Sequence, residues 1–380
     1  MWPATNGCNA AGHTEMRRLV LTAFAWILVP MVERAIGPSI DPDEEVVFFP
    51  TFAVKDGQGH WRGRVHGWIF EPEENSIVRE QFVSAVRGSV GPLPDAASEQ
   101  RFERRVRAFL VDNERRQKIQ IRIGEHQIPL EESAPNGHFF CTVSIPDEWL
   151  SPPDSPSPGP RILRYRAVVP ADDPRVFEGE IHLLGPTAIS VISDVDDTIK
   201  ISEVLDGKRL LANTFVHEYR AVPGMAQAYQ RWSELGASFH YVSASPWQLY
   251  SFLRPFTAAG GFPAGTWHMK TFRAKDSSVM NLFDSPMEYK VGQIEAVMAA
   301  LPLRSFILVG DSGEQDPEAY GEIARRHQDR VRRIFIRDIT GEGQGSPRMQ
   351  KAFTGLPVQK WTTFSDAEGL ALQLTESSGF

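Results

Sequence analysis

The feature that most constrains this chain is the alternation of short apolar segments with helical segments in its second half. Each apolar segment is only a few residues long, as is typical of a buried strand, and amphipathic segments of about 10–15 residues separate them. Because such crossovers join parallel strands, we predict an α/β fold with a Rossmann-like parallel sheet and helices on both faces. The predicted strands are 189–193, 238–243, 305–310 and 331–337.

The first half of the chain has a different pattern. Between about residues 46 and 184, β-branched and aromatic residues form short runs bounded by Gly, Pro and Asp, which predicts strands and turns. One helix is expected near residues 97–111, because Phe102 and Val106 lie on one helical face. The proline-rich stretch 151–160 predicts a loop. We therefore expect a mostly-β, sandwich-like module ahead of the parallel sheet.

These patterns divide the chain into an N-terminal apolar and basic segment 1–37, a mostly-β module 38–187 and an α/β domain 188–380. Within the first part, the run 19–32 spans about 21 Å as a helix, which is shorter than the roughly 30 Å hydrocarbon core of a bilayer. Three alternatives stay open for it: a docked helix, a membrane-surface or short anchor helix, and a signal peptide. The expected location is the cytoplasm, with peripheral membrane association through this segment as the alternative.

Charge and cysteine content exclude two classes of function. The 40 basic and 48 acidic residues give a net charge of −8, which argues against a nucleic-acid partner bound through bulk positive charge. The two cysteines, Cys8 and Cys141, are too few for a disulfide framework or a cysteine-rich zinc site.

The first predicted strand of the parallel sheet ends in the sequence DVDDT, residues 194–198. The strand places Asp194 and Asp196 at the edge where ligands bind, while Val195 can turn into the core. Two carboxylates so close repel each other unless a cation lies between them, and Mg²⁺ suits oxygen ligands. Asp194 can then attack phosphorus, and Asp196, kept protonated by its neighbours, can protonate the leaving oxygen and later activate water. A solvated acidic turn is the alternative.

Later strand and helix ends supply complementary groups. The second strand ends at Ser243, whose hydroxyl suits a phosphoryl oxygen or a helix N-cap. Lys290 heads an apolar helical stripe, which directs its ammonium group toward the sheet, where burial is costly unless it meets anions, and snorkelling to the surface is the alternative. The strand SFILV leads to Asp311 and Asp316, although Asp316 before proline also suits an N-cap. This order predicts Mg²⁺-assisted phosphoryl transfer through an aspartyl-phosphate.

At these residues the sequence resembles the haloacid-dehalogenase (HAD) superfamily of phosphohydrolases. The longer strings ISVISDVDDTIKISEV, FHYVSASPWQLY and FILVGDSGEQDPEAYGEIA are similar to the catalytic domain of the actin-patch-associated phosphatidate phosphatase family, over roughly residues 185–340. The resemblance implies Mg²⁺-dependent hydrolysis of phosphatidate to diacylglycerol and phosphate. A HAD-type phosphatase of a soluble phosphomonoester is the alternative, and a phospholipid-binding module without turnover is a third hypothesis.

The resemblance also implies a role for individual residues. The partner is then a phospholipid substrate at a membrane surface, with Mg²⁺ as cofactor, and the sequence identifies no protein partner. The catalytic residues are Asp194 and Asp196, the phosphate-binding residues are Thr198, Ser243 and Lys290, and the metal ligands are Asp194, Asp196, Asp311 and Asp316.

Two surface features bear on access of a lipid to this site. The intervals between the site residues leave room for a small flap and not for a folded cap domain, so we expect an open site. The aromatic residues after Ser243 are expected in the core, with the mouth of the site as the alternative. A basic stretch within residues 101–122 predicts a solvated helix face, with attraction of anionic lipid as the alternative. Those aromatic residues are Trp247, Tyr250, Phe252 and Phe256.

Overall fold

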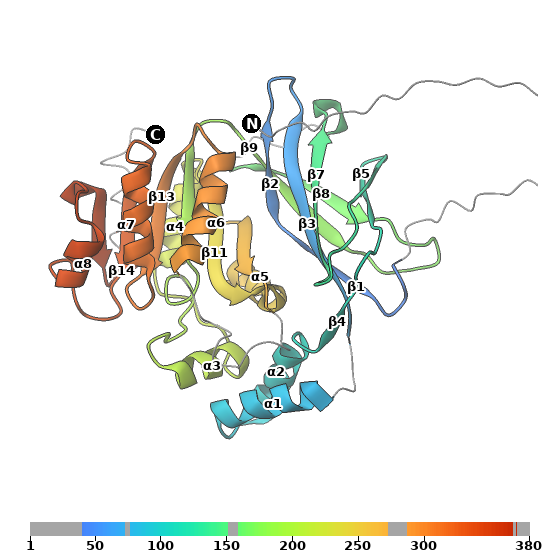
Figure 1. The fold of residues 1–380 in the computed structure, drawn as a ribbon, viewed down its shortest axis with the longest axis horizontal. Coiled ribbons are helices and arrows are strands. Elements are labelled where there is room, and N and C mark those ends of the chain that lie inside the picture. Colours follow the sequence, from blue (N-terminus) through green and yellow to red (C-terminus); the bar gives the residue numbers. More distant parts are fainter. Residues whose placement is uncertain (1–39, 73–76, 151–158, 273–286, 368–369, 371–380) are drawn as a thin grey trace, which may run out of the picture. The chain divides into compact units, whose positions relative to one another are not determined.

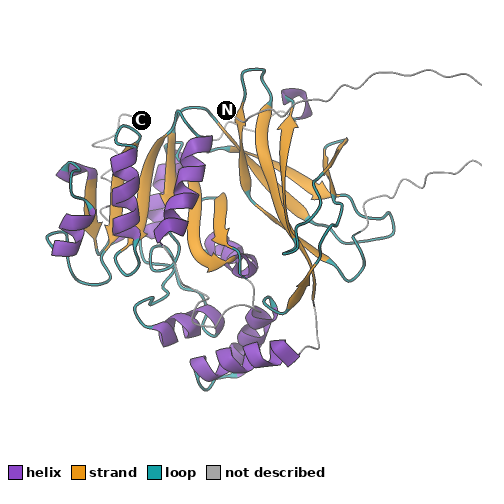
Figure 2. Cartoon of the chain, in the orientation of Figure 1, coloured by secondary structure: helices purple, strands orange, loops and turns teal. Residues whose placement is uncertain are grey.

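The described strands form two sheets (Figures 1 and 2). A nine-stranded, mainly antiparallel sheet comes from the first half of the chain, and a six-stranded parallel sheet comes from the second. This arrangement confirms the expected α/β class with a mostly-β region before it, while the predicted boundary after residue 187 stays a prediction. The computed structural model describes residues 40–72, 77–150, 159–272, 287–367 and 370, so the predicted segment 1–37 lies outside the described residues.

The parallel sheet positions the site. Its central strand β10 lies between β11 and β13, so that both edges of β10 are hydrogen-bonded to neighbours. Every neighbouring pair in the sheet is parallel. In spatial order the strands are β12 (Gly265–Lys270), β11 (Ser238–Pro246), β10 (Ile189–Ser193), β13 (Ser305–Asp311), β14 (Val331–Arg337) and β15 (Trp361–Phe364).

Helices cover both faces of this sheet, as predicted. Val191 of β10 packs in a cluster that contains residues of α4 (Met225–Glu234), while the next residue, Ile192, packs with α6 (Met287–Ala300) and α7 (Asp316–Arg326). Because successive strand side chains point to opposite faces, a strand buried along its whole length needs cover on both sides. All five residues of β10 are buried.

The strands of the first half are hydrogen-bonded into one sheet, and side chains from both ends of that sheet pack in one buried cluster, so the expected sandwich-like packing stays a prediction. The long strand β3 pairs with β1, β2, β4 and β7 and so holds them in one hydrogen-bonded sheet. The pair β2–β9 is parallel and the other pairs are antiparallel. The strands are β1 (Glu45–Phe49), β2 (Thr51–Lys55), β3 (Trp61–Pro72), β4 (Val111–Asn113), β5 (Gln120–Ile123), β6 (His126–Pro129), β7 (His138–Ile145), β8 (Arg161–Ala167) and β9 (Glu178–Leu184).

The helix predicted at 97–111 is α2 (Ala96–Arg107), which Asp95 caps by accepting a hydrogen bond from the backbone N–H of Ser98 at 2.7 Å. A preceding helix, α1 (Ile77–Val90), was not predicted, because its valine-rich sequence also suits a strand. Most of the predicted loop 151–160 lies outside the described residues. Among the described helices, none is long and apolar enough to cross a membrane. The remaining helices are α3 (Gly207–Phe215), α5 (Tyr250–Ala259) and α8 (Pro347–Ala352).

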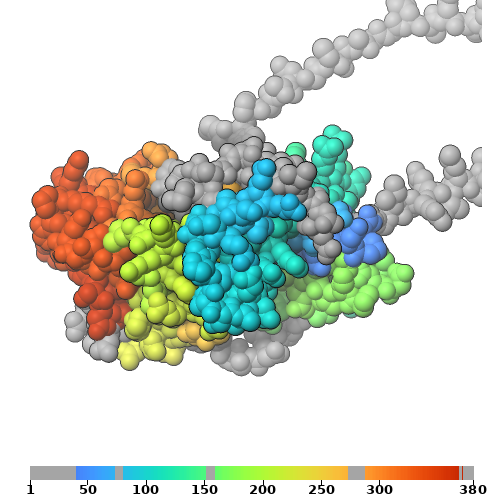
Figure 3. All heavy atoms as spheres, turned by 90° about the horizontal axis from the view of Figure 1, so that it is seen from below, coloured from blue at the N-terminus to red at the C-terminus, as the bar shows by residue number. Residues whose placement is uncertain are grey.

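The two halves of the chain share a hydrophobic core. Helices α1 and α2 lie beside α3 (Figure 3). Phe102 and Phe109 of the first half belong to the same buried cluster as Phe215 of α3 and Val191 of the parallel sheet. Arg105 links the halves further, since its Nη1 donates to the carbonyl oxygen of Thr214 at 2.9 Å. The first half is therefore packed into the core that supports the site.

Two helical glycines test this packing with the same chemical change. A Cβ on Gly321 of α7 would lie 2.0 Å from the carbonyl oxygen of Ala352 in α8, whereas a Cβ on Gly292 of α6 meets nothing within 4 Å. We expect Gly321→Ala to lower the free energy of unfolding by about 1–3 kcal/mol, because backbone must move. Gly292→Ala should raise it by up to about 1 kcal/mol through helix propensity. Urea denaturation measures both, and shifts of the same sign would contradict the packing.

Candidate active site

The turn after β10 carries the acidic pair. The backbone N–H of Asp194 donates to the carbonyl oxygen of Val309 in β13 at 2.9 Å, which continues the sheet for one more residue. Val195 is completely buried in the core, as predicted, and Asp196 follows it. Asp197 has a left-handed backbone with φ 53°, and its carboxylate accepts backbone N–H groups of the segment 202–204 at 2.7–3.0 Å. The carboxylate of Asp197 therefore stabilises the turn that carries Asp194 and Asp196.

Lys290 lies within a group of carboxylates. Its Nζ donates to Asp194 Oδ1 and Glu314 Oε2, both at 3.0 Å, and also to Asp316 Oδ1. The side chain is 3 % exposed. Burial lowers the pKa of Lys290, but the surrounding carboxylates outweigh burial and hold the pKa well above its usual value. The prediction that this lysine points toward the sheet and meets anions is confirmed.

The same carboxylates fit a hard cation. Oxygens of Asp194, Glu314 and Asp316 lie within 4.8 Å of one another. Asp194 Oδ2 and Asp311 Oδ2 are buried and have no hydrogen-bond partner among the described residues. Burial, together with the neighbouring carboxylates, raises the pKa of Asp194 and of Asp311 well above the usual range. A donor set made only of oxygens, with two oxygens unsatisfied, suits a divalent cation.

Asp196 has separate partners. Its Oδ1 accepts from Lys200 Nζ at 2.9 Å and from Ser202 Oγ at 2.6 Å. Its Oδ2 accepts from Ser245 Oγ at 2.9 Å and from Ser243 Oγ at 3.3 Å. Burial raises the pKa of Asp196, but the charge of Lys200 and these hydrogen bonds outweigh burial and lower it. The expectation that neighbours keep Asp196 protonated is therefore wrong for this state of the protein, because Lys200 stabilises the carboxylate.

The predicted phosphate ligands lie beside the acids. Ser243 follows Val242 of β11, and its Oγ accepts the backbone N–H of Ser245 at 3.0 Å while donating to Asp196. Thr198 Oγ1 is buried without a hydrogen-bond partner among the described residues. Lys290 is the third member of the set. The structure thus gathers these groups around the acidic pair, and their binding of phosphate stays a prediction.

Four residues of the site were missed by the sequence analysis. Lys200 lies four positions after Asp196 in the same string, and its charge could have identified it. Glu314 lies between the two acids that were selected after β13, so a search of that string for every carboxylate would have found it. The two serines carried no comparable signal, because neither is charged, and the partner of Ser245 lies 49 residues away in the sequence. The missed residues are Lys200, Ser202, Ser245 and Glu314.

The described site is closed, which differs from the open site that we expected. Asp196 is the most exposed of the predicted site residues, at 7 %. The segment after the DVDDT turn lies against the loop after β13, since a Cβ on Gly313 would lie 2.8 Å from Val204 Cγ2. These two loops therefore contact each other next to the carboxylates. The interval between β10 and β11 holds the helices α3 and α4 and no further named strand among its residues, all of which are described.

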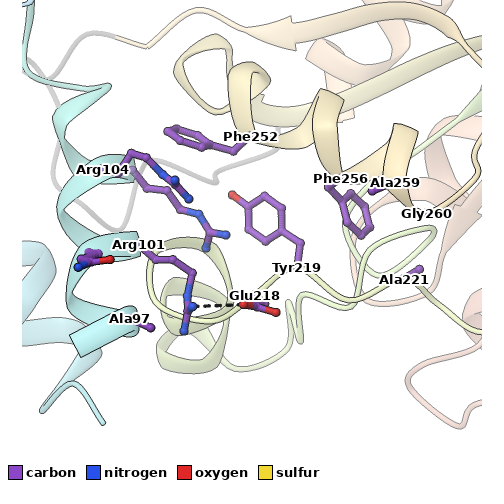
Figure 4. A pocket seen from close by; sticks show the side chains of 12 residues that line it. Ala97, Arg101, Arg104, Glu218, Tyr219, Ala221, Phe252, Phe256, Ala259 and Gly260 are labelled. Carbon is purple, nitrogen blue, oxygen red and sulfur yellow. Dashed lines mark hydrogen bonds and ion pairs between the residues drawn. The ribbon is translucent and has the colours of Figure 1, made fainter. Parts of the chain in front are cut away.

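Away from this site, a hollow of about 550 Å³ lies between α2 and α5 (Figure 4). Arg105 places its guanidinium 3.9 Å from the centre of the Tyr219 ring, and Arg104 lies 6.0 Å from the ring centre of Phe252. Arg101 forms an ion pair with Glu218 at 3.3 Å. Part of the basic stretch therefore lies against aromatic rings, and attraction of anionic lipid by it stays a prediction.

The four aromatic residues after Ser243 divide into two pairs. Trp247 and Tyr250 are buried and pack on Phe49 of β1, with ring centroids 4.1 and 5.0 Å apart. Their expected place in the core is confirmed. Phe252 and Phe256 are partly exposed and line the arginine-containing hollow (Figure 4).

Comparison with known proteins confirms the resemblance inferred from the motifs. Residues 189–338 match the family model described as the catalytic domain of phosphatidate phosphatase APP1. Phosphatidate phosphatase APP1 of Saccharomyces cerevisiae is 33 % identical over 160 residues, which are 41 % of this chain and 27 % of the yeast protein. An uncharacterized protein of Schizosaccharomyces pombe is 29 % identical over 180 residues, 46 % of this chain and 29 % of its own length. The matched region therefore spans less than a third of these curated relatives.

Among solved structures, a provisionally assigned beta-phosphoglucomutase from Thermotoga maritima is similar to half of the chain. The match covers 50 % of this chain and 100 % of that one, with 11 % sequence identity and a TM-score of 0.31. A score this low carries no argument about function.

The carboxylate cluster predicts stabilisation by a divalent cation. At a Mg²⁺ concentration 100 times its dissociation constant, we expect the free energy of unfolding to rise by about 2.7 kcal/mol. Asp316→Asn should lose most of this increase, whereas Asp329→Asn, at an exposed position after α7, should keep it. Thermal unfolding in EDTA and in MgCl₂ measures the effect for each variant. An equal response of all three proteins would contradict a cation site at Asp316.

Proposed function

We propose that this protein is a Mg²⁺-dependent phosphatidate phosphatase that acts through an aspartyl-phosphate at Asp194. The observation that carries the proposal is the Lys290-bound carboxylate cluster at the carboxyl edge of a parallel sheet, in which Asp194 Oδ2 has no hydrogen-bond partner among the described residues. The match of residues 189–338 to a phosphatidate phosphatase catalytic domain supports the choice of substrate. The substrate is then a phosphomonoester on a lipid, and the products are diacylglycerol and phosphate.

The first chemical step uses the free oxygen of Asp194. Asp194 Oδ2 attacks phosphorus, the bond between phosphorus and the glycerol oxygen breaks, and Asp196 donates a proton to that oxygen. Lys290 reduces the charge repulsion between the carboxylate and the phosphoryl group. Mg²⁺, held by Asp194, Asp311 and Asp316, would add positive charge at the same place. Because burial raises the pKa of Asp194, this added charge would also favour the ionised form of the nucleophile.

The second step regenerates the enzyme. Asp196, now a carboxylate, takes a proton from water, and the resulting hydroxide attacks phosphorus and releases phosphate from Asp194. Asp196 thereby regains the proton that it donates in the next turnover. Ser243 and Ser245 now donate to Asp196, and when they turn to a bound phosphate, as proposed for Ser243, the carboxylate loses two of its donors. Its affinity for a proton then rises.

The proposal places the substrate at a membrane surface and the protein in the cytoplasm. Peripheral attachment through the segment 1–37 is part of the proposal and concerns residues outside those that the structure describes.

The direct test is release of phosphate from phosphatidate in mixed micelles. We expect release in MgCl₂, none in EDTA, and none above background for Asp194→Asn, because the amide cannot form the aspartyl-phosphate. Asp329→Asn serves as the matched control and should retain full activity. Glucose 6-phosphate and p-nitrophenyl phosphate are assayed in parallel. Release from these soluble esters alone would keep the mechanism and reject the lipid substrate, and no release from any ester would reject both.

Asp196 has a distinct expected phenotype. Asp196→Asn should lower turnover of phosphatidate by about 10²–10⁴-fold, because the leaving oxygen loses its proton donor. p-Nitrophenol leaves readily without a proton, so the first step with p-nitrophenyl phosphate should be less affected. Burst kinetics with that ester measure the step directly. Equal loss of the burst and of phosphatidate turnover would contradict a role for Asp196 in protonating the leaving group.

A further inference from the structure

A cavity of about 830 Å³ lies between the antiparallel sheet and the parallel half of the protein. Strands β2, β3 and β7 form one wall, and β12 and α6 form another. Volumes of about 300–1,000 Å³ with a mainly apolar lining are typical of small-ligand sites. The apolar and aromatic side chains of the lining include Phe52, Val54, Phe140, Trp247, Trp267 and Met269.

The cavity reaches the catalytic edge of the sheet at two points. His268 of β12 lines it and is paired in register with Val242, the residue before Ser243. Tyr289 of α6 also lines it and precedes Lys290 in the chain. From Tyr289 the lining continues along α6 to Ala300, a length of about 16 Å at 1.5 Å per residue. The cavity is therefore elongated, and at one end its lining residues adjoin Lys290 in the chain and Val242 in the sheet.

Two histidines of the lining are hydrogen-bonded to residues behind it, and the buried hydroxyl of Tyr289 has no hydrogen-bond partner among the described residues. His66 Nε2 lies 3.0 Å from His138 Nδ1, and His268 Nε2 lies 3.1 Å from Thr266 Oγ1. Arg64 differs, because its guanidinium lies 4.9 Å from the ring centre of Phe140 and forms no ion pair with another described residue. The result is an apolar interior with an exposed cation at its rim, which suits an anionic amphiphile.

We propose that this cavity binds one acyl chain of the phosphatidate whose phosphate reacts at Asp194. The proposal rests on the proposed function for the position of the phosphate and adds the place of the chain. One chain leaves the bilayer and enters the cavity, and Arg64 lies at the rim toward the anionic surface. Each methylene group buried in the cavity then strengthens binding about fourfold.

The test measures binding without turnover. Full-length Asp194→Asn is titrated calorimetrically with monomeric lysophosphatidate homologues of increasing chain length and with glycerol 3-phosphate. Ala296 is a small, exposed residue of α6 that lines the cavity, so adding Ala296→Trp fills it. Ala299→Trp is the matched control, because Ala299 is exposed on the same helix and does not line the cavity.

We expect affinity to rise about fourfold per methylene in Asp194→Asn and with the added Ala299→Trp. With Ala296→Trp this dependence should disappear, and the longest homologue should bind at least tenfold more weakly, while glycerol 3-phosphate binds as before. Should Ala296→Trp unfold the protein, Thr142→Trp fills the cavity from β7, with Ser144→Trp as its exposed control outside the lining.

Affinity that does not depend on chain length would overturn the proposal, as would equal effects of Ala296→Trp and Ala299→Trp. The experiments distinguish failure of the acyl-chain proposal from failure of the proposed function. Chain-dependent binding with no release of phosphate by the unsubstituted protein in MgCl₂ would support the cavity and reject the phosphatase. Release of phosphate without chain-dependent binding would support the phosphatase and reject the acyl-chain site.

Discussion

The structure of the site depends on one buried ammonium group. Lys290 Nζ contacts carboxylates from the end of β10, from the loop after β13 and from the start of α7, so one charge ties three elements together. Charges are costly to bury unless they are paired, and removing one partner of a buried pair costs about 3–5 kcal/mol. Lys290 is itself held by α6, whose apolar stripe packs under the sheet. The packing of α6 and the electrostatics of the site are therefore coupled.

One lysine is not enough for this many acids. Asp194, Asp311, Glu314 and Asp316 lie around it, and the pKa of the first three is raised, mainly by burial. The surplus of negative charge explains why a cation site is expected here and not elsewhere along the sheet edge. The two aspartates of the turn differ in pKa for this reason. Asp194 shares Lys290 with other acids and has a raised pKa, whereas Asp196 is paired with Lys200 and has a lowered pKa. The proposed reaction needs the opposite: Asp194 must be ionised and Asp196 must be protonated. A cation at Asp194 would lower the pKa of that carboxyl group, and a phosphate that draws Ser243 away from Asp196 would raise the pKa of Asp196.

The antiparallel sheet contributes to the function as well as to the fold. It shares a hydrophobic cluster with the parallel sheet, and its strands β2, β3 and β7 form a wall of the cavity beside the site. A catalytic domain cut at residue 188 would lose both. The sequence similarity to known phosphatidate phosphatases lies within the second half, whereas the proposed acyl-chain site requires both halves.

The sequence by itself determined the elements whose signals are local. Strands β10 and β14 have the predicted bounds, and Val195 and Lys290 point where their periodicity placed them, because burial pattern and helical spacing depend on near neighbours. Parallel topology also brings strand ends to one edge, which was enough to group Asp194 with Asp311. The tertiary structure alone decided that Lys200 pairs with Asp196, that Glu314 joins the cluster and that β3 holds the first half in one sheet. These outcomes depend on which atoms meet across distant segments, and neither spacing nor composition contains that geometry.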